Sequence, residues 1–320
     1  DVVDEQPPSE LTSQNSADGR RRNPLRQDLR VLRDPNVARL VLSRLISDLG
    51  SGIGPIALAF GVLGLPGGGP TGLGIVLASA AVPRIAFLLF AGVFADRGNR
   101  VRLLVVAELV MAATWAVAAA LFISGHASVP VISLLAMIGG VATALFYPTH
   151  TGLIPQVVAD DQLQSTNALI RLASNIASIG GVALGGLLVS VIGSGWALSI
   201  NALTYVLSAL LLVGIVVQRE AAPDDSHSMI DELVHGWREF TRRRWVWLIV
   251  VVFSLSNVGF GAAVGVVGPV IAVESWGGAR SWALVMAAFS AGRPKASQPK
   301  GCSTLKPRMR FIRAQMSPMM

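Results

Sequence analysis

Charged residues are scarce in this 320-residue sequence, and cysteine is scarcer still. Asp, Glu, Lys and Arg make up 14% of the chain, and 52% of its residues are hydrophobic. A typical soluble domain carries roughly 25% charged residues. The single cysteine, Cys302, excludes a disulfide within the chain and any cysteine-based metal cluster. With a mean hydropathy of +0.59, this composition predicts an all-α polytopic membrane protein rather than a soluble domain.

Long apolar runs supply the expected membrane spans. Roughly 20 apolar residues cross ~30 Å of hydrocarbon. Asp34 suits a helix N-cap and Pro35 the first helical position, so the first span begins there. An eighth apolar run begins near Ser281 but fails after about a dozen residues, too few to span. The other expected helices cover about 34–63, 72–95, a third ending near 123, a fourth ending near 146, and then 166–191, 196–217 and 245–273.

Arginine is concentrated on one side of the expected membrane. Eight arginines lie before or at the start of the first span, three in the loop 96–102, and five between the sixth and seventh spans. The loops 63–71, 124–129 and 192–195 hold no Lys or Arg. The positive-inside bias therefore predicts a multi-pass protein of the cell (plasma) membrane with a cytoplasmic N-terminus.

Composition divides the chain into five expected segments. Two of them are membrane segments, and both are followed by polar stretches rich in arginine or lysine. Within the third segment, apolar residues recur at helical spacing before a basic stretch, which favours an interfacial amphipathic helix. The segments are a disordered cytoplasmic tail (1–33), an N-terminal six-helix transmembrane bundle (34–217), a cytoplasmic linker with an amphipathic helix (218–244), the start of a second transmembrane half (245–292) and an aberrant basic tail (293–320).

A weak internal repeat links the first and seventh spans. Residues 46–52 read ISDLGSG and residues 255–261 read LSNVGFG, so Asp48 corresponds to Asn257. Parallel six-helix repeats are one way to build a transporter, with its substrate site between the halves. The repeat therefore predicts two parallel halves, the second beginning at the seventh span.

The stretch AGVFADRGNRVRLLVV (91–106) places charges between two apolar runs. It resembles the loop between helices 2 and 3 of the major facilitator superfamily, which reads Gly-x-x-x-Asp-Arg followed by basic residues. The matching positions are Gly92, Asp96, Arg97 and Arg100, while Asn99 stands where a second glycine is usual. The resemblance implies the six-helix N-terminal half of that fold, plus helix 7 and a partial helix 8. It also implies that this loop acts as a gating latch.

The fifth span carries SIGGVALGGLL, which resembles the antiporter motif Gly-Pro-x-x-Gly-Gly of drug-exporting members, with Val182 in place of the proline. The glycines form a small-residue face for close helix packing, either in that role or as a generic packing face. The helix 4–5 region and the linker resemble exporters of macrolides and siderophores, and the likeness covers about residues 30–292. The packing-motif residues are Gly181, Gly185 and Gly186.

Polar side chains inside the apolar runs are candidates for function because buried charge is costly in a bilayer. Asp48 is the first candidate for a proton carrier, since Asn257 cannot titrate; alternatively it is a structural carboxylate paired with Arg44 or Arg84. Arg84 needs an acidic partner, a water-filled cavity or an anionic ligand. Glu108 is a possible partner or a second proton site.

Polar stripes also follow the fifth and sixth spans. They either line a wet cavity or hold helices together. In the fifth span we expect Arg171 and Asn175 to lie on the substrate pathway. The stripes comprise Asn167, Arg171, Asn175 and Ser178, and then Asn201, Thr204, Tyr205 and Ser208.

The last 28 residues differ in composition from the rest of the chain. They hold all three lysines, the cysteine and four of the eight methionines. We expect a shifted reading frame that removes helices 8–12, so that the chain is C-terminally truncated; the alternative is a basic tail that binds anionic lipid.

The sequence therefore predicts a secondary active transporter that expels a small amphipathic molecule in exchange for protons, and it predicts that this chain is incomplete. The alternative is a non-transporting remnant or a half-transporter that depends on a partner. No phosphate-binding loop, nucleophile–base pair or metal-ligand spacing is visible. We therefore expect no enzyme activity, metal, cofactor, nucleotide or nucleic acid. The expected partners are a small-molecule substrate, protons and the lipid bilayer.

Overall fold

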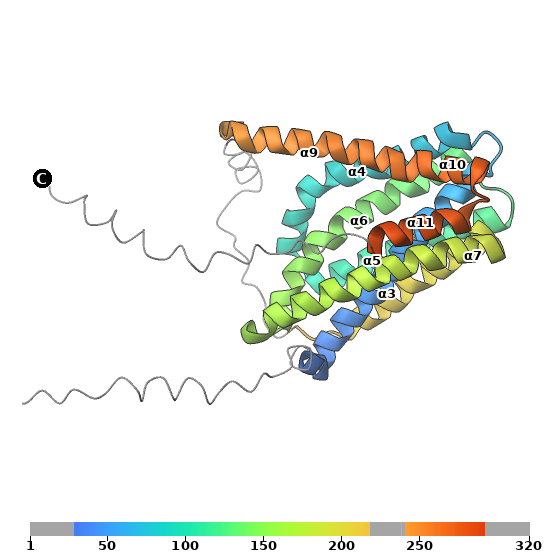
Figure 1. Cartoon of the computed structure of the whole chain (residues 1–320). Helices are drawn as coiled ribbons and strands as arrows, with labels where there is room; N and C mark the ends of the chain where they lie inside the picture. The colour runs from blue at the N-terminus through green and yellow to red at the C-terminus, as the bar shows by residue number, and fades with distance from the viewer. Residues whose placement is uncertain (1–28, 218–237, 239–240, 292–320) are drawn as a thin grey trace, which may run out of the picture.

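A computed structural model describes residues 29–217, 238 and 241–291, and this part of the chain is built from helices with no strand (Figure 1). Six stretches of it are long and apolar enough to cross a membrane, which confirms the predicted all-α polytopic fold. The elements are η1 (Leu29–Arg33), α3 (Pro35–Leu63), α4 (Gly69–Arg97), α5 (Arg100–Ile123), α6 (Val129–Val157), η2 (Asp160–Gln162), α7 (Leu163–Val213), α9 (Arg244–Ala262), the π-helical turn η3 (Ala263–Val267), α10 (Gly268–Ser275) and α11 (Ala279–Ala291).

Helix α7 contains two spans separated by one glycine. Gly193 has φ 84° and ψ 167°, a conformation that side chains with a Cβ rarely adopt. The chain bends there, so the N-terminal half of α7 (163–192) and its C-terminal half (194–213) correspond to the fifth and sixth predicted spans. The sequence GSG therefore marks the break correctly.

Side chains cap the starts of two helices. Asp34 accepts a hydrogen bond from the backbone N–H of Asn36 at 2.8 Å, and Pro35 is the first residue of α3, as predicted. Asn99 accepts from the N–H of Arg102 at 3.0 Å and begins α5. Because α4 continues to Arg97, only two residues connect α4 with α5, where the sequence predicts the longer loop 96–102.

The fourth span is longer than the sequence predicts. The expected end lies near residue 146, before Pro148, but α6 continues to Val157 and contains both Pro148 and Pro155. Each proline removes a backbone donor. The added turns bury His150, Leu153 and other side chains, and this packing outweighs the lost hydrogen bonds.

Three predicted segments lie wholly or partly outside the described residues. The disordered tail is predicted to reach residue 33, whereas Leu29–Arg33 form η1 because Val31 is buried against the bundle. The linker 218–244 is described only at Arg238 and 241–244, and its predicted amphipathic helix lies outside the described residues. The basic tail 293–320 lies outside them too.

The helices pack in a bundle whose neighbours are far apart in sequence (Figure 1). Helix α3 lies along α7, α4 lies against α6, and α5 contacts both α6 and α7. Helix α11 packs on α7. Two buried clusters hold these contacts, one around Leu40 and Leu153 and the other around Ile53 and Leu198. Most other large apolar side chains face outward, almost all of α9 included, as expected of helices that meet lipid or further helices.

Candidate functional site

An ion pair lies deep within the first span. Arg44 Nε donates to Asp48 Oδ2 at 2.7 Å, and the two side chains are only 11% and 13% exposed. Asp48 follows Pro35 by 13 residues, which places it about 20 Å along α3 at about 1.5 Å per residue. A charge at this depth is costly unless it is paired, and the two charges neutralise each other. Of the two predicted structural partners of Asp48, the structure brings Arg44 to it and not Arg84.

Two further helices hold the Arg44 side chain. Its Cζ lies 5.1 Å from the ring centre of Phe146 and 5.1 Å from that of Tyr147, both in α6. Its Nε also lies 3.5 Å from the Ser174 hydroxyl of α7. Cation–π contacts of this kind are stronger where water is excluded. Arg44 therefore joins α3, α6 and α7 at one point, beside the titratable group.

A cavity of about 430 Å³ opens beside this ion pair. Arg171 and Asn175, the predicted pathway residues, lie on its exposed side, and Asn167 lines it too. Among the described residues, the lining holds two guanidinium groups and no carboxylate. Three of the four residues of the polar stripe in the N-terminal half of α7 thus line a cavity, whereas Ser178 does not. The lining residues are Arg44, Tyr147, His150, Thr151, Ile154, Asn167, Ile170, Arg171, Ser174 and Asn175.

His150 is a cavity residue that sequence reasoning missed. It is 5% exposed and stacks on Phe146 with ring centres 5.6 Å apart. Its Nε2 has no hydrogen-bond partner among the described residues. The predicted fourth span ends before Pro148, which leaves His150 outside the helix. The spacing of Phe146, His150 and Ile154 at i, i+4 and i+8 is the signal that would have found it.

Glu108 lies in a second polar cluster, between α5 and the C-terminal half of α7. It is 1% exposed, and the Ser208 hydroxyl donates to its Oε1 at 3.0 Å. No Arg or Lys of the described helices forms an ion pair with it. Close by in the same interface, the Ser51 and Tyr205 hydroxyls lie 3.0 Å apart, and Asn201 is completely buried. The polar stripe of the sixth span is therefore buried between helices rather than lining the 430 Å³ cavity.

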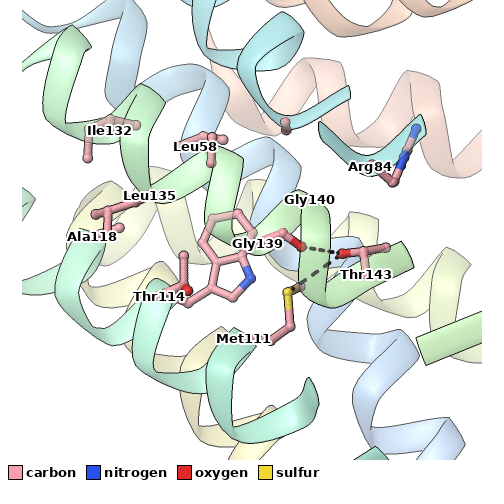
Figure 2. Close-up of a pocket in the computed structure, with 13 residues that line it drawn as sticks. Leu58, Arg84, Met111, Thr114, Ala118, Ile132, Leu135, Gly139, Gly140 and Thr143 are labelled. Atoms are coloured by element: carbon pink, nitrogen blue, oxygen red, sulfur yellow. Dashed lines mark hydrogen bonds between the residues drawn. The ribbon is translucent and has the colours of Figure 1, made fainter. Parts of the chain in front are cut away.

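Arg84 is separate from both clusters. It lies in the middle of α4, where its side chain is exposed, and it lines a small apolar cavity between α3, α4, α5 and α6 (Figure 2). No carboxylate of the described helices lies within ion-pair distance of it.

The predicted gating residues lie at the turn between two helices. Asp96 and Arg97 belong to the last turn of α4, Gly92 lies one turn earlier, and Arg100 is the first residue of α5. Arg100 donates a hydrogen bond from Nη1 to the carbonyl of Gly152 in α6. This contact ties the start of α5 to the end of α6. The surroundings of Gly92, Asp96 and Arg97 lie outside the described part of the chain.

The glycines of the predicted packing motif lie at close helix contacts. A Cβ at Gly181 would lie 2.2 Å from the Leu49 carbonyl oxygen of α3, and one at Gly185 would lie 3.0 Å from Ile53 Cα. Gly186 faces the other way, where a Cβ would lie 2.1 Å from that of Ala283 in α11. Gly181 and Gly185 thus let α7 approach α3, and Gly186 lets it approach α11.

The described helices form an apolar bundle with an ion pair at mid-depth and a polar cavity beside it, and the comparisons with known proteins place the chain in a family of membrane transporters. Residues 28–312 match the major facilitator family described as transmembrane secretion effector, and the chain belongs to that family. It is similar to YkuC of Bacillus subtilis (strain 168), an uncharacterised MFS-type transporter, with 22% identity over 191 residues. That match covers 60% of this chain but only 44% of YkuC, so the chain spans less than half of this relative.

Proposed function

We propose that this chain forms the proton-coupled part of a secondary active exporter that expels a small amphipathic molecule in exchange for protons. The observation that carries the proposal is the Arg44–Asp48 ion pair, 2.7 Å long, beside the 430 Å³ cavity. The protein would lie in the plasma membrane with its N-terminus in the cytoplasm, as the distribution of arginine favours.

In this proposal Asp48 carries the proton. As a carboxylate it holds Arg44, and the pair is close to neutral. When Asp48 Oδ2 takes a proton, the electrostatic attraction is lost and Arg44 is freed to change its contacts with Phe146, Tyr147 and Ser174. Because those contacts join three helices, protonation would bias the arrangement of the bundle. Glu108, buried without a cationic partner among the described residues, is the proposed second proton site.

The cavity is the proposed entry point for the substrate. Arg171 and Asn175 offer hydrogen-bond donors on its open side, and the two guanidinium groups disfavour a cation there. The polar end of the substrate is therefore uncharged or anionic. Of the two kinds of substrate that the resemblance in the sequence suggests, a siderophore-like molecule with oxygen-rich polar groups fits this cavity better than a basic macrolide. The turn with Asp96, Arg97 and Arg100 is the proposed gate.

Dye efflux from proteoliposomes tests the proposal. With the lumen loaded with an uncharged amphipathic dye, a proton gradient directed into the vesicle should drive dye release by the wild-type chain. Asp48→Asn keeps the side-chain size but removes the titratable group, so it should abolish the gradient dependence. Asn257→Gln, at the repeat position in α9, is the matched control and should leave it unchanged. Efflux that responds equally to the gradient in wild type and Asp48→Asn would exclude Asp48 as the carrier.

A second candidate function is a half-transporter that works only with a partner chain. The outward-facing apolar side chains of α9, such as Phe253 and Leu255, favour it, because nothing among the described helices covers them. No gradient-driven efflux by the chain alone, with efflux restored by co-reconstitution of the C-terminal half of a longer relative, would favour this function over the first.

A further inference from the structure

A second cavity lies between α3, α4, α5 and α6, and Asp48 is not among the described residues that line it (Figure 2). Its volume is about 120 Å³. Its walls come from all four helices, with Leu58 of α3, Ala80 of α4, Met111 and Trp115 of α5, and Ile132 of α6. The mechanism proposed above does not use this cavity.

The interior of this cavity is apolar in its chemistry. Its two threonines use their hydroxyl protons within their own helices, since Thr114 Oγ1 donates to the Val110 carbonyl at 2.7 Å and Thr143 Oγ1 donates to the Gly139 carbonyl at 2.8 Å. A buried water needs about two to four polar partners. Apart from Arg84, the one side-chain donor of the described walls without a hydrogen-bond partner is the indole Nε1 of Trp115. An engineered apolar cavity of roughly 150 Å³ stays dry and binds benzene. The cavity is therefore suited to one small ring or branched alkyl group.

Arg84 supplies the single charge among the described residues that line the cavity (Figure 2). It lies about 20 Å from either end of α4, at about 1.5 Å per residue, which is close to the middle of the bilayer. No carboxylate of the described helices pairs with it. A guanidinium at this depth needs an acceptor, and its planar fork of donors matches a carboxylate.

We propose that this cavity binds the apolar ring of an amphipathic molecule whose adjacent carboxylate accepts hydrogen bonds from Arg84. The inference deepens the proposed function, since the occupant would be the transported molecule, but the binding step requires neither a gradient nor Asp48. The ring fills the apolar space and the carboxylate neutralises Arg84.

Gly139 allows the cavity to be filled without moving a helix. A Cβ there would lie 3.7 Å from Thr114 Cγ2 and 3.8 Å from Met111 Sδ, which are ordinary contacts. Gly139→Ala therefore places a methyl group in the cavity and leaves the fold intact. At the neighbouring Gly140, a Cβ would lie 2.2 Å from the Ala80 carbonyl oxygen, so that position cannot be used. Gly74 of α4 faces open space, and Gly74→Ala is the matched control.

The test uses two probes on the purified full chain in lipid nanodiscs, 4-fluorobenzoate and fluorobenzene, with saturable binding followed by fluorine NMR. We expect both probes to bind the wild type. Gly139→Ala should weaken both at least about tenfold, and Gly74→Ala should weaken neither. Arg84→Gln should weaken 4-fluorobenzoate about tenfold and leave fluorobenzene unchanged.

The proposal is overturned if 4-fluorobenzoate shows no saturable binding, if Gly139→Ala binds both probes like the wild type, or if Arg84→Gln leaves 4-fluorobenzoate binding unchanged. Asp48→Asn separates this inference from the proposed function. If this variant binds both probes normally, the cavity acts independently of the proton carrier. If the wild type then binds both probes but shows no transport, the result contradicts the proposed export function and leaves the binding proposal intact.

Discussion

Arg44 donates a 2.7 Å hydrogen bond to Asp48 one helical turn away, and the same guanidinium lies over two aromatic rings of another helix. An i, i+4 ion pair by itself contributes little in water, about 0.3–0.5 kcal/mol. Within the membrane the pairing has a different effect, because it lowers the cost of placing a titratable carboxylate at mid-depth by making it part of a neutral pair.

Replacing Arg44 weakens the point at which three helices meet. Arg44→Gln removes the cation that pairs with Asp48 and lies over two rings of α6, so the variant should export dye more slowly than the wild type and melt at a lower temperature. Dye efflux from proteoliposomes and thermal unfolding in detergent check this prediction. Arg171→Gln removes a guanidinium from the same cavity that is not paired with Asp48, and it should change both quantities less. Equal effects in the two variants would assign them to net charge in the cavity.

Substitution in the glycine face of α7 destabilises the bundle. In Gly181→Ala the added Cβ meets the Leu49 carbonyl oxygen, and overpacking of this kind costs about 1–3 kcal/mol. Gly180→Ala, one residue earlier, faces open space and should be neutral or slightly stabilising. Thermal unfolding in detergent compares the two. Equal melting temperatures would contradict a close contact between α3 and α7 at Gly181.

Glu108 is the proposed second proton site, whereas Ser208 only donates a hydrogen bond to it. Glu108→Gln keeps the shape but cannot titrate, so fewer protons should move for each substrate molecule. Ser208→Ala removes only the 3.0 Å hydrogen bond and should lower stability by about 1 kcal/mol while leaving the stoichiometry unchanged. Proton flux and dye flux are measured on the same vesicles. If the ratio of proton flux to dye flux in Glu108→Gln equals that of the wild type, Glu108 carries no proton and Asp48 is the sole proposed carrier.

The contact between Arg100 and Gly152 joins the ends of α5 and α6. Arg100→Ala should lower the free energy of unfolding by about 1 kcal/mol and alter the rate of dye efflux, because the neighbouring turn is the proposed gate. Arg102→Ala, at an exposed position in the same turn, is the control for loss of positive charge. If the rate of dye efflux falls equally in both variants, the loss of positive charge and not the Arg100–Gly152 contact is responsible for the slower efflux.

The sequence predicted the features that depend on local chemistry. Asp34 and Pro35 fixed the start of α3, the glycine at 193 fixed the break in α7, and apolar runs fixed the existence of the spans. The predicted end of the fourth span, before Pro148, was wrong. Helix α6 continues through this proline because burial of His150 and its neighbours outweighs the hydrogen bond that the proline removes.

Tertiary neighbours could not be read from spacing. The pairing of Asp48 with Arg44 follows from their separation of four residues, but the rings of Phe146 and Tyr147 that hold Arg44 lie about a hundred residues away in sequence. Likewise, the sequence treated the two polar stripes alike. The structure separates them, since Asn175 faces a cavity and Asn201 is buried between helices.

The central claim is that Asp48 couples proton movement to export. The most direct measurement follows the lumenal pH of proteoliposomes with a trapped pH-sensitive dye while the exported dye is added to or withheld from the lumen. The account predicts that the wild type acidifies the lumen only when the exported dye is present, and that Asp48→Asn does not acidify it in either case. Dye-dependent acidification of equal rate in Asp48→Asn would contradict it.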